Sequence, residues 1–261
     1  MTRDERQAAL ELIANEVRAC TACRLAEGRT RAVPGEGDPD TEVVLVGEGP
    51  GFNEDREGRP FIGRAGALLV RMLASIGWQR EDVFITNVVK CRPPDNRDPQ
   101  PDEIAACAPF LRRQLEVLDP SVVVTLGRYS MGTFMPGARI GQAHGTTMPA
   151  DPATGARDAL VFAMYHPAAA LRTQALEQVS FEDIARVPAV LITSRERRAA
   201  HAEAGEPAAT PNDADAPAPA PAIATSHVPA PAAQPAKASA SSLPVESPAA
   251  SADDASQLTL F

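Results

Sequence analysis

Four cysteines are the residues whose spacing most directly suggests chemistry. Cys20, Cys23, Cys91 and Cys107 form the pattern C-x2-C-x67-C-x15-C and are the only cysteines in the sequence. The N-terminus is charged, and no run approaches about 18 apolar residues, so we expect a soluble intracellular protein. Thiols in that setting bind metals more often than they form disulfides. The residues alone leave structural zinc and an iron–sulfur cluster as nearly even alternatives.

Three polar residues, each at the end of an apolar run, form a second candidate site. They are Glu48, Asn87 and His166. Taken singly, each has an ordinary structural role, as a helix cap, a turn residue or a buried histidine. Taken together, a carboxylate, an amide and an imidazole at three such ends favour a functional site.

The elements that must position these residues are four strands. Runs of consecutive apolar residues over 42–47, 83–89, 121–127 and 160–166 predict strands that are covered on both faces. Their spacing of about 40 residues allows a helical crossover between strands. We therefore expect an α/β fold, a three-layer α/β/α sandwich around a mainly parallel four-stranded sheet. Ligands of such sheets bind beyond the carboxyl ends of the strands.

Helical spacing of apolar residues predicts the covering layers. One stripe covers residues 68–76 and ends at Gly77, and another covers 104–118 and ends at Asp119-Pro120. An N-terminal helix carries apolar residues 10, 13 and 17. A last helix is expected from about residue 168 into the 190s, interrupted at Pro188.

The first predicted strand runs into a glycine-rich loop. The loop reads GEGPG over residues 47–51, and GRPFIG follows over 58–63. Its glycines allow the backbone to approach a ligand closely. A nucleotide-triphosphate site is disfavoured, because GxxxxGK[ST] is absent and the loop carries carboxylates that would repel phosphate.

Composition divides the chain and limits its partners. Of the 61 residues from His201 to Phe261, 30 are Ala or Pro, so that segment cannot bury a core. We expect one catalytic domain over residues 1–198, a disordered linker over 199–255 and a short peptide over 256–261. The net charge of −9 argues against general polyanion binding, so any contact with nucleic acid must be a local patch.

The motifs in order resemble a known family. GEGPG, then EDREGRPFIGRAGALL, TNVVKCRPPDNRDP and HPAAALR, together with the four cysteines, are similar to the family 4, iron–sulfur uracil-DNA glycosylases. The resemblance covers about residues 20–171. It implies a DNA-repair hydrolase that flips uracil out of DNA and cleaves its N-glycosidic bond. It also implies that Cys20, Cys23, Cys91 and Cys107 hold a structural 4Fe-4S cluster.

The resemblance further implies how uracil is recognised. The amide of Asn87 can accept a hydrogen bond from uracil N3–H and donate one to O4, whereas cytosine presents the opposite pattern. Phe61 is expected to stack on the ring, and Glu54 to occupy the space that the thymine methyl group would need. His166 and backbone amides near Gly49 are expected to stabilise charge at O2.

Catalysis and DNA contact complete the implied site. Glu48 is the candidate for activating water, oriented by Asn96, because Gly49 stands where related families carry a catalytic acid or amide. Leu171 is the expected wedge that fills the gap left by the flipped base, with Arg172 near a phosphate. Ala168 stands where family members often have serine.

The last residues carry a separate expectation. QLTLF at residues 257–261 resembles the bacterial peptide that binds the replication sliding clamp, with Gln257, Leu258, Leu260 and Phe261 as its contacts. A flexible linker would then tether the enzyme near replicating DNA. We expect a cytoplasmic, nucleoid-associated monomer.

Two alternatives stay open at this point. A protein with the same fold and pocket could bind deaminated bases or the clamp without catalysis. The family 5 relatives accept a broader range of deaminated bases, but they have a different first loop, and GEGPG disfavours them.

Overall fold

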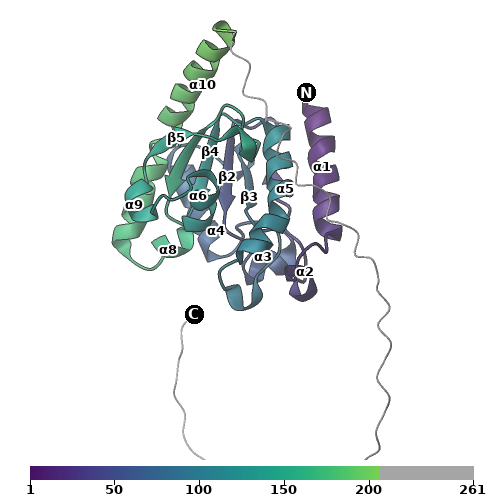
Figure 1. The fold of residues 1–261 in the computed structure, drawn as a ribbon. Coiled ribbons are helices and arrows are strands. Elements are labelled where there is room, and N and C mark those ends of the chain that lie inside the picture. Colours follow the sequence, from purple (N-terminus) through teal and green to yellow (C-terminus); the bar gives the residue numbers. More distant parts are fainter. Residues whose placement is uncertain (206–261) are drawn as a thin grey trace, which may run out of the picture. The chain divides into compact units, whose positions relative to one another are not determined.

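The computed structural model describes residues 1–205, and they form a six-stranded sheet with helices on both faces (Figure 1). The strand order is β1-β3-β2-β4-β6-β5. The four inner strands, β2, β3, β4 and β6, run parallel, and β1 and β5 pair antiparallel at the two edges. The strands are β1 (Glu36–Gly37), β2 (Val43–Gly47), β3 (Phe84–Asn87), β4 (Val122–Leu126), β5 (Thr147–Pro149) and β6 (Leu160–Met164).

The predicted α/β/α sandwich and its four parallel strands are confirmed, and the sheet is larger than predicted. The two extra strands are only two and three residues long. A strand this short has no detectable period-2 pattern, so the sequence did not indicate it. β3 ends at Asn87, before the predicted end at residue 89. The N–H groups of Val88 and Val89 instead donate to Gly47 O and Glu48 O, at 3.0 and 3.1 Å.

Ten α-helices in the described residues surround the sheet. They are α1 (Arg3–Ala19), α2 (Leu25–Gly28), α3 (Phe52–Glu57), α4 (Arg64–Ser75), α5 (Pro101–Leu118), α6 (Arg128–Phe134), α7 (Ile140–Ala143), α8 (Pro167–Ala170), α9 (Gln174–Ile184) and α10 (Val187–Glu203). As predicted, the last helical segment is interrupted, and Pro188 lies in the first turn of α10, where its missing N–H costs no hydrogen bond.

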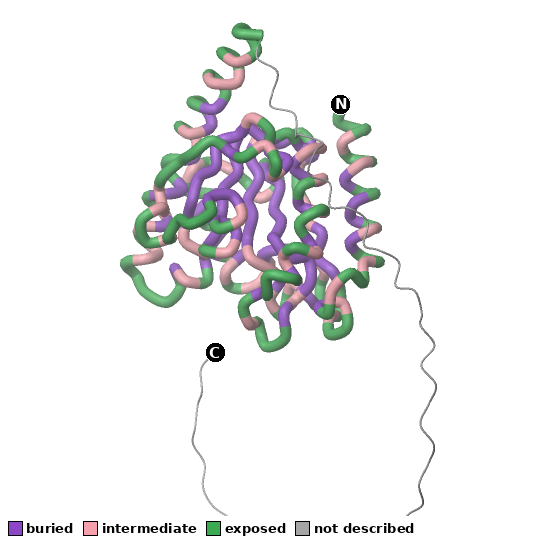
Figure 2. Tube along the Cα trace, viewed as in Figure 1, coloured by how far each residue is buried: buried purple, intermediate pink, exposed green. Residues whose placement is uncertain are grey.

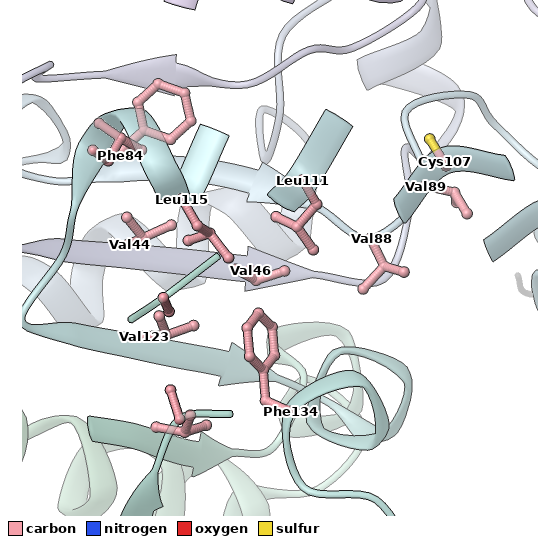
Figure 3. Packing of buried hydrophobic residues seen from close by; sticks show 14 of the residues in the cluster. Val44, Val46, Phe84, Val88, Val89, Cys107, Leu111, Leu115, Val123 and Phe134 are labelled. Atoms are coloured by element: carbon pink, nitrogen blue, oxygen red, sulfur yellow. The ribbon is translucent and has the colours of Figure 1, made fainter. Parts of the chain in front are cut away.

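Alternate strand residues supply two separate apolar cores. One core packs α1, α5 and α6 against one face of the sheet, and the other packs α4, α9 and α10 against the opposite face. Figure 3 shows the first core, in which Val44, Val46 and Val123 meet side chains of α5 and α6. All five residues of β2, β4 and β6 are buried, and Figure 2 shows the exposed residues on the outer helix faces and loops. Burial on both faces explains why these strands read as continuous apolar runs.

The ends of the described chain bear on two expectations. α10 continues to Glu203, so the chain is still helical beyond residue 198, where we expected the catalytic domain to end. The expected linker from residue 206 onward and the expected peptide over 256–261 lie outside the described residues. Within residues 1–205, no helix has both the length and the apolarity needed to span a membrane.

Candidate active site

The carboxyl ends of the parallel strands bring the predicted polar residues together. β2 and β3 are in register with Gly47 opposite Asn87, so Glu48, the residue after Gly47, begins its loop beside Asn87. The next pair ends with Leu126 opposite Met164, which brings Gly127 close to His166. The rule for open α/β sheets therefore places three chain-distant residues at one edge.

These residues line one cavity of about 620 Å³. Among the residues predicted to contact uracil or DNA, all but Leu171 contribute to its wall. Leu171 follows α8 and is 37% exposed outside the cavity wall. The predicted residues in the wall are Glu48, Gly49, Glu54, Phe61, Asn87, Asn96, His166 and Arg172.

Asn87 presents an unused acceptor to this cavity. The residue is 1% exposed, and its Oδ1 atom is buried without a hydrogen-bond partner among residues 1–205. An unpaired buried acceptor costs about 1–3 kcal/mol. A ligand that donates a hydrogen bond to Oδ1 would recover that cost.

Phe61 lies against His166 on the wall of the cavity. Their ring centroids are 5.6 Å apart, with an angle of 27° between the planes. Phe61 has a positive φ of 50°, which is unusual for an aromatic residue, so its position is imposed by its surroundings. Its carbonyl accepts from Arg80 Nη1 at 2.9 Å, and a Cβ on Gly66 would come within 1.8 Å of that same oxygen.

His166 is held as a neutral donor. It caps α8, and its Nδ1 accepts the backbone N–H of Ala168 at 3.0 Å. Nδ1 is therefore unprotonated, and in the neutral ring the proton sits on Nε2. Burial lowers the pKa of His166 to about 4, although the nearby Glu54 carboxylate opposes this shift. The ring is thus uncharged at neutral pH.

Glu48 is a carboxylate with a perturbed proton affinity. Burial raises its pKa, and the negative charge of Asp98 raises it further, while Arg128 acts in the opposite direction. The predicted orientation by Asn96 has no counterpart among the described hydrogen bonds. The Oδ1 atom of Asn96 instead accepts from Arg92 Nε at 2.7 Å.

Glu54 is fixed by the start of a helix. Its Oε1 atom accepts the backbone N–H groups of Ile62 and Gly63, at 3.0 and 2.9 Å, directly before α4. The positive end of the helix dipole stabilises this carboxylate. Glu54 is therefore a rigid part of the cavity wall.

The four cysteines converge on a second, small cavity between α1, the loop after β3, and α5. All four line it, together with Lys90 and Arg29. Three N–H groups point at their sulfurs: Arg29 Nη1 to Cys91 Sγ at 3.0 Å, Lys90 N to Cys107 Sγ at 3.2 Å and Ala22 N to Cys20 Sγ at 3.4 Å. The cysteines are free thiols, with no disulfide among the described residues.

The four thiols form a donor set of the kind that a 4Fe-4S cluster uses. No group of three or more His, Cys, Asp or Glu side chains within residues 1–205 is arranged to hold one metal ion. A tetrahedral zinc site requires four ligands around one point. In a 4Fe-4S cluster each thiolate binds a different iron, so the sulfurs lie farther apart. Four cysteines, with N–H groups donating to three of the sulfurs, fit the ligands that such a cluster needs.

Sequence reasoning missed several residues that shape the site. Gly47, Gly66 and Gly127 leave room for Asn87, Phe61 and His166, because an added Cβ would meet those residues within 3 Å. Lys90 was given no role, although it is one of only two lysines in the sequence and interrupts a buried apolar run. The available signal in the sequence was a lysine at the end of an apolar run, directly before an expected metal ligand.

Comparisons with known proteins identify the family. The model of the Uracil DNA glycosylase superfamily matches residues 34–186. The chain belongs to this superfamily. It is similar to three proteins named type-4 uracil-DNA glycosylase. The one from Sulfurisphaera tokodaii is 45% identical over 71% of this chain and 86% of its own length. The one from Saccharolobus solfataricus is 48% identical over 70% of this chain and 86% of its own length. The one from Thermotoga maritima is 45% identical over 69% of this chain and 93% of its own length.

Proposed function

We propose that this chain is a monofunctional uracil-DNA glycosylase of the type-4 group. It binds uracil-containing DNA and hydrolyses the N-glycosidic bond, leaving free uracil and an abasic site for base excision repair. The similarity to type-4 enzymes over about 70% of the chain supports this function. The observation that carries it is the unpaired Oδ1 atom of Asn87, buried in a cavity beside Phe61 and His166.

Recognition depends on the pattern of donors and acceptors in the flipped base. Oδ1 of Asn87 accepts uracil N3–H, and its NH2 group donates to O4. Cytosine would place its N3 acceptor against Oδ1 and its N4 amino donor against the NH2 group of Asn87. Each mismatched group would cost about 1–3 kcal/mol of binding free energy. Phe61 supplies the stacking face. Glu54, held by the start of α4, fills the space beside C5 and excludes thymine.

Bond cleavage depends on stabilising charge on the leaving base. As the glycosidic bond breaks, the sugar becomes oxocarbenium-like and negative charge develops on uracil O2. The neutral His166 donates from Nε2 to this oxygen, and the backbone near Gly49 adds a donor. Glu48 orients the water that attacks C1′, and its raised pKa is suited to accepting a proton from that water.

DNA contact and the metal centre belong to the same proposal. Leu171, exposed beside the cavity, fills the space vacated by uracil, and Arg172 contacts a phosphate. Cys20, Cys23, Cys91 and Cys107 would hold a 4Fe-4S cluster. When bound, the cluster supplies a structural cross-link between the end of α1, the loop after β3, and α5.

Association with replication would come from the far end of the chain. Residues Gln257, Leu258, Leu260 and Phe261 would bind the sliding clamp, and the protein would act in the cytoplasm as a monomer. A titration of a peptide of residues 257–261 with purified clamp tests the first point. Absence of binding would remove the clamp without affecting the glycosylase function.

A single-turnover assay tests the function. A uracil-containing oligonucleotide is incubated with excess enzyme, and abasic sites are measured as alkali-sensitive breaks. Wild-type protein should cleave at uracil and not at cytosine or thymine. Asn87→Ala should reduce the rate about a hundredfold or more. Asn15→Ala, on α1 and away from the cavity, is the control. A wild-type protein that binds uracil-DNA without producing breaks would contradict the enzymatic assignment and favour a binding protein.

A further inference from the structure

Lys90 is a buried cation between the two sites. It is 1% exposed and follows β3, three residues after Asn87 and one before Cys91. It is among the largest fully buried side chains of the described chain. A buried ammonium group is strongly destabilising unless hydrogen bonds and an opposite charge compensate it.

The hydrogen bonds of Lys90 use all three ammonium protons. Nζ donates to Thr86 Oγ1 at 2.6 Å, to the Asn87 carbonyl oxygen at 2.8 Å and to Gln114 Oε1 at 2.7 Å. The Thr86 hydroxyl and the Gln114 amide both donate to Pro34 O, at 2.9 and 2.7 Å. Their oxygens are therefore oriented as acceptors toward Lys90. Three acceptors around one nitrogen indicate the charged form.

No carboxylate balances this charge among the ion pairs of residues 1–205, where each basic partner is an arginine or a histidine. The cysteines beside Lys90 would supply the balancing charge, because they bind a cluster as thiolate anions. Lys90 lines the same cavity as all four cysteines, and its backbone N–H donates to Cys107 Sγ. A 4Fe-4S cluster ligated by four thiolates is an anion, and charge near it affects its reduction potential.

We propose that Lys90 is the counter-cation of the cluster and a positioning residue for uracil recognition. One ammonium group is held by the charge of the cluster on one side and holds the carbonyl of Asn87 on the other. The backbone of Asn87 is thereby fixed, and its side-chain amide points into the uracil cavity. The inference rests on the proposed function, because it takes Asn87 as the uracil reader and the cysteines as cluster ligands.

Two variants of the holoenzyme test the two roles of Lys90, which are to balance the charge of the cluster and to position Asn87. Lys90→Met removes the charge and the hydrogen bonds, and Lys90→Gln removes the charge but keeps an N–H donor on a side chain one bond shorter. Arg29→Met is the matched control: Arg29 also donates to a cluster cysteine, but its other described hydrogen bond goes to Arg18 O, away from the uracil cavity. Affinity is measured with an oligonucleotide carrying 2′-fluoro-2′-deoxyuridine, whose fluorine slows cleavage, and the cluster potential by spectroelectrochemistry.

The expected results differ between the variants. The cluster potential should fall in all three, because each loses a nearby positive charge. Binding of the fluorinated oligonucleotide should weaken roughly tenfold in Lys90→Met, less in Lys90→Gln, and not in Arg29→Met. Should Lys90→Met fail to accumulate, Lys90→Gln gives the same comparison.

Two outcomes would overturn the proposal. An unchanged potential in both Lys90 variants would show that Lys90 does not balance the cluster. Equal affinity in wild type and Lys90→Met would show that it does not position Asn87. Both tests presuppose a wild-type protein that excises uracil, so loss of that activity in wild type would count against the proposed function and not against Lys90.

Discussion

A Cβ atom on Gly47 would stand 2.4 Å from Oδ1 of Asn87. Two adjacent strands thus meet at a point where one side chain must be absent for the other to reach the cavity. The same Cβ would lie 2.6 Å from Phe61 Cζ, so one glycine makes room for both the hydrogen-bonding and the stacking surface.

Gly47→Ala should therefore damage uracil excision more than stability. We expect the single-turnover rate to fall at least a hundredfold, because Asn87 and Phe61 must both move, and the free energy of unfolding to fall by about 1–3 kcal/mol. Gly132→Ala is the control, because nothing lies within 4 Å of the added Cβ in α6. Wild-type activity in Gly47→Ala would contradict the assigned positions of both side chains.

The main elements of this fold could be predicted because their causes are local. The strands are buried on both faces and read as apolar runs, and α4 and α5 follow helical stripes that end where Gly77 and Asp119 adopt positive φ. Glu48, Asn87 and His166 could be placed at one edge because parallel strands end together. The edge strands were too short to leave a pattern.

The details of the site could not be read from the sequence. The Oδ1 atom of Asn96 accepts a hydrogen bond from Arg92, a contact that depends on the conformation of the loop and that the sequence did not indicate. Asn96 has a positive φ of 53° within such a loop. The burial of Lys90 depends on Gln114 and Pro34, which are distant in the chain, so no local signal predicts its partners.

His166 should remain uncharged well below neutral pH. Its folded pKa of about 4 lies below the ordinary value of 6.5, so protonation of this ring should not limit the rate between pH 7 and 5.5. Imidazole ¹⁵N shifts should report a neutral ring protonated on Nε2 across that range. A ring that titrates near pH 6.5 would refute its role as a neutral donor. His166→Ala should lower the rate about a hundredfold, and His201→Ala on α10 should not.

The same shift predicts a dependence of stability on pH. The unfolded state binds a proton at His166 below about pH 6.5, whereas the folded state does so only near pH 4. Folding stability should therefore fall as the pH drops through this window. His166→Gln should lose less stability over the same window, by on the order of 2 kcal/mol, measured by urea unfolding at several pH values.

Ionisation of Glu48 should set the acidic limb of the pH–rate profile, that is, the fall of the excision rate toward low pH. Its raised pKa places this limb above the ordinary carboxyl value of 4.5, because activity needs the ionised form. Arg128 Nη2 and Asp98 Oδ2 are 2.5 Å apart and act on Glu48 in opposite directions. Asp98→Asn should move the limb to lower pH, and Arg128→Gln should move it to higher pH.

The Glu48 prediction has an internal control. Glu48→Gln should lower the rate by about 10²–10⁴-fold and remove the limb. Glu57→Gln, at the exposed end of α3, should change neither the rate nor the limb. A limb that stays in place in both the Asp98 and the Arg128 variants would assign it to a different group.

Removal of the cluster should destabilise the fold. The cysteines join three segments, and the loop after β3 also holds the glycine-rich loop through the Val89 N–H to Glu48 O bond. Cys107→Ser should therefore lower the iron content, the visible absorption and the melting temperature. Ala105→Ser, exposed on the same helix, should leave all three unchanged. A purified chain with one zinc and no visible absorption would contradict the cluster.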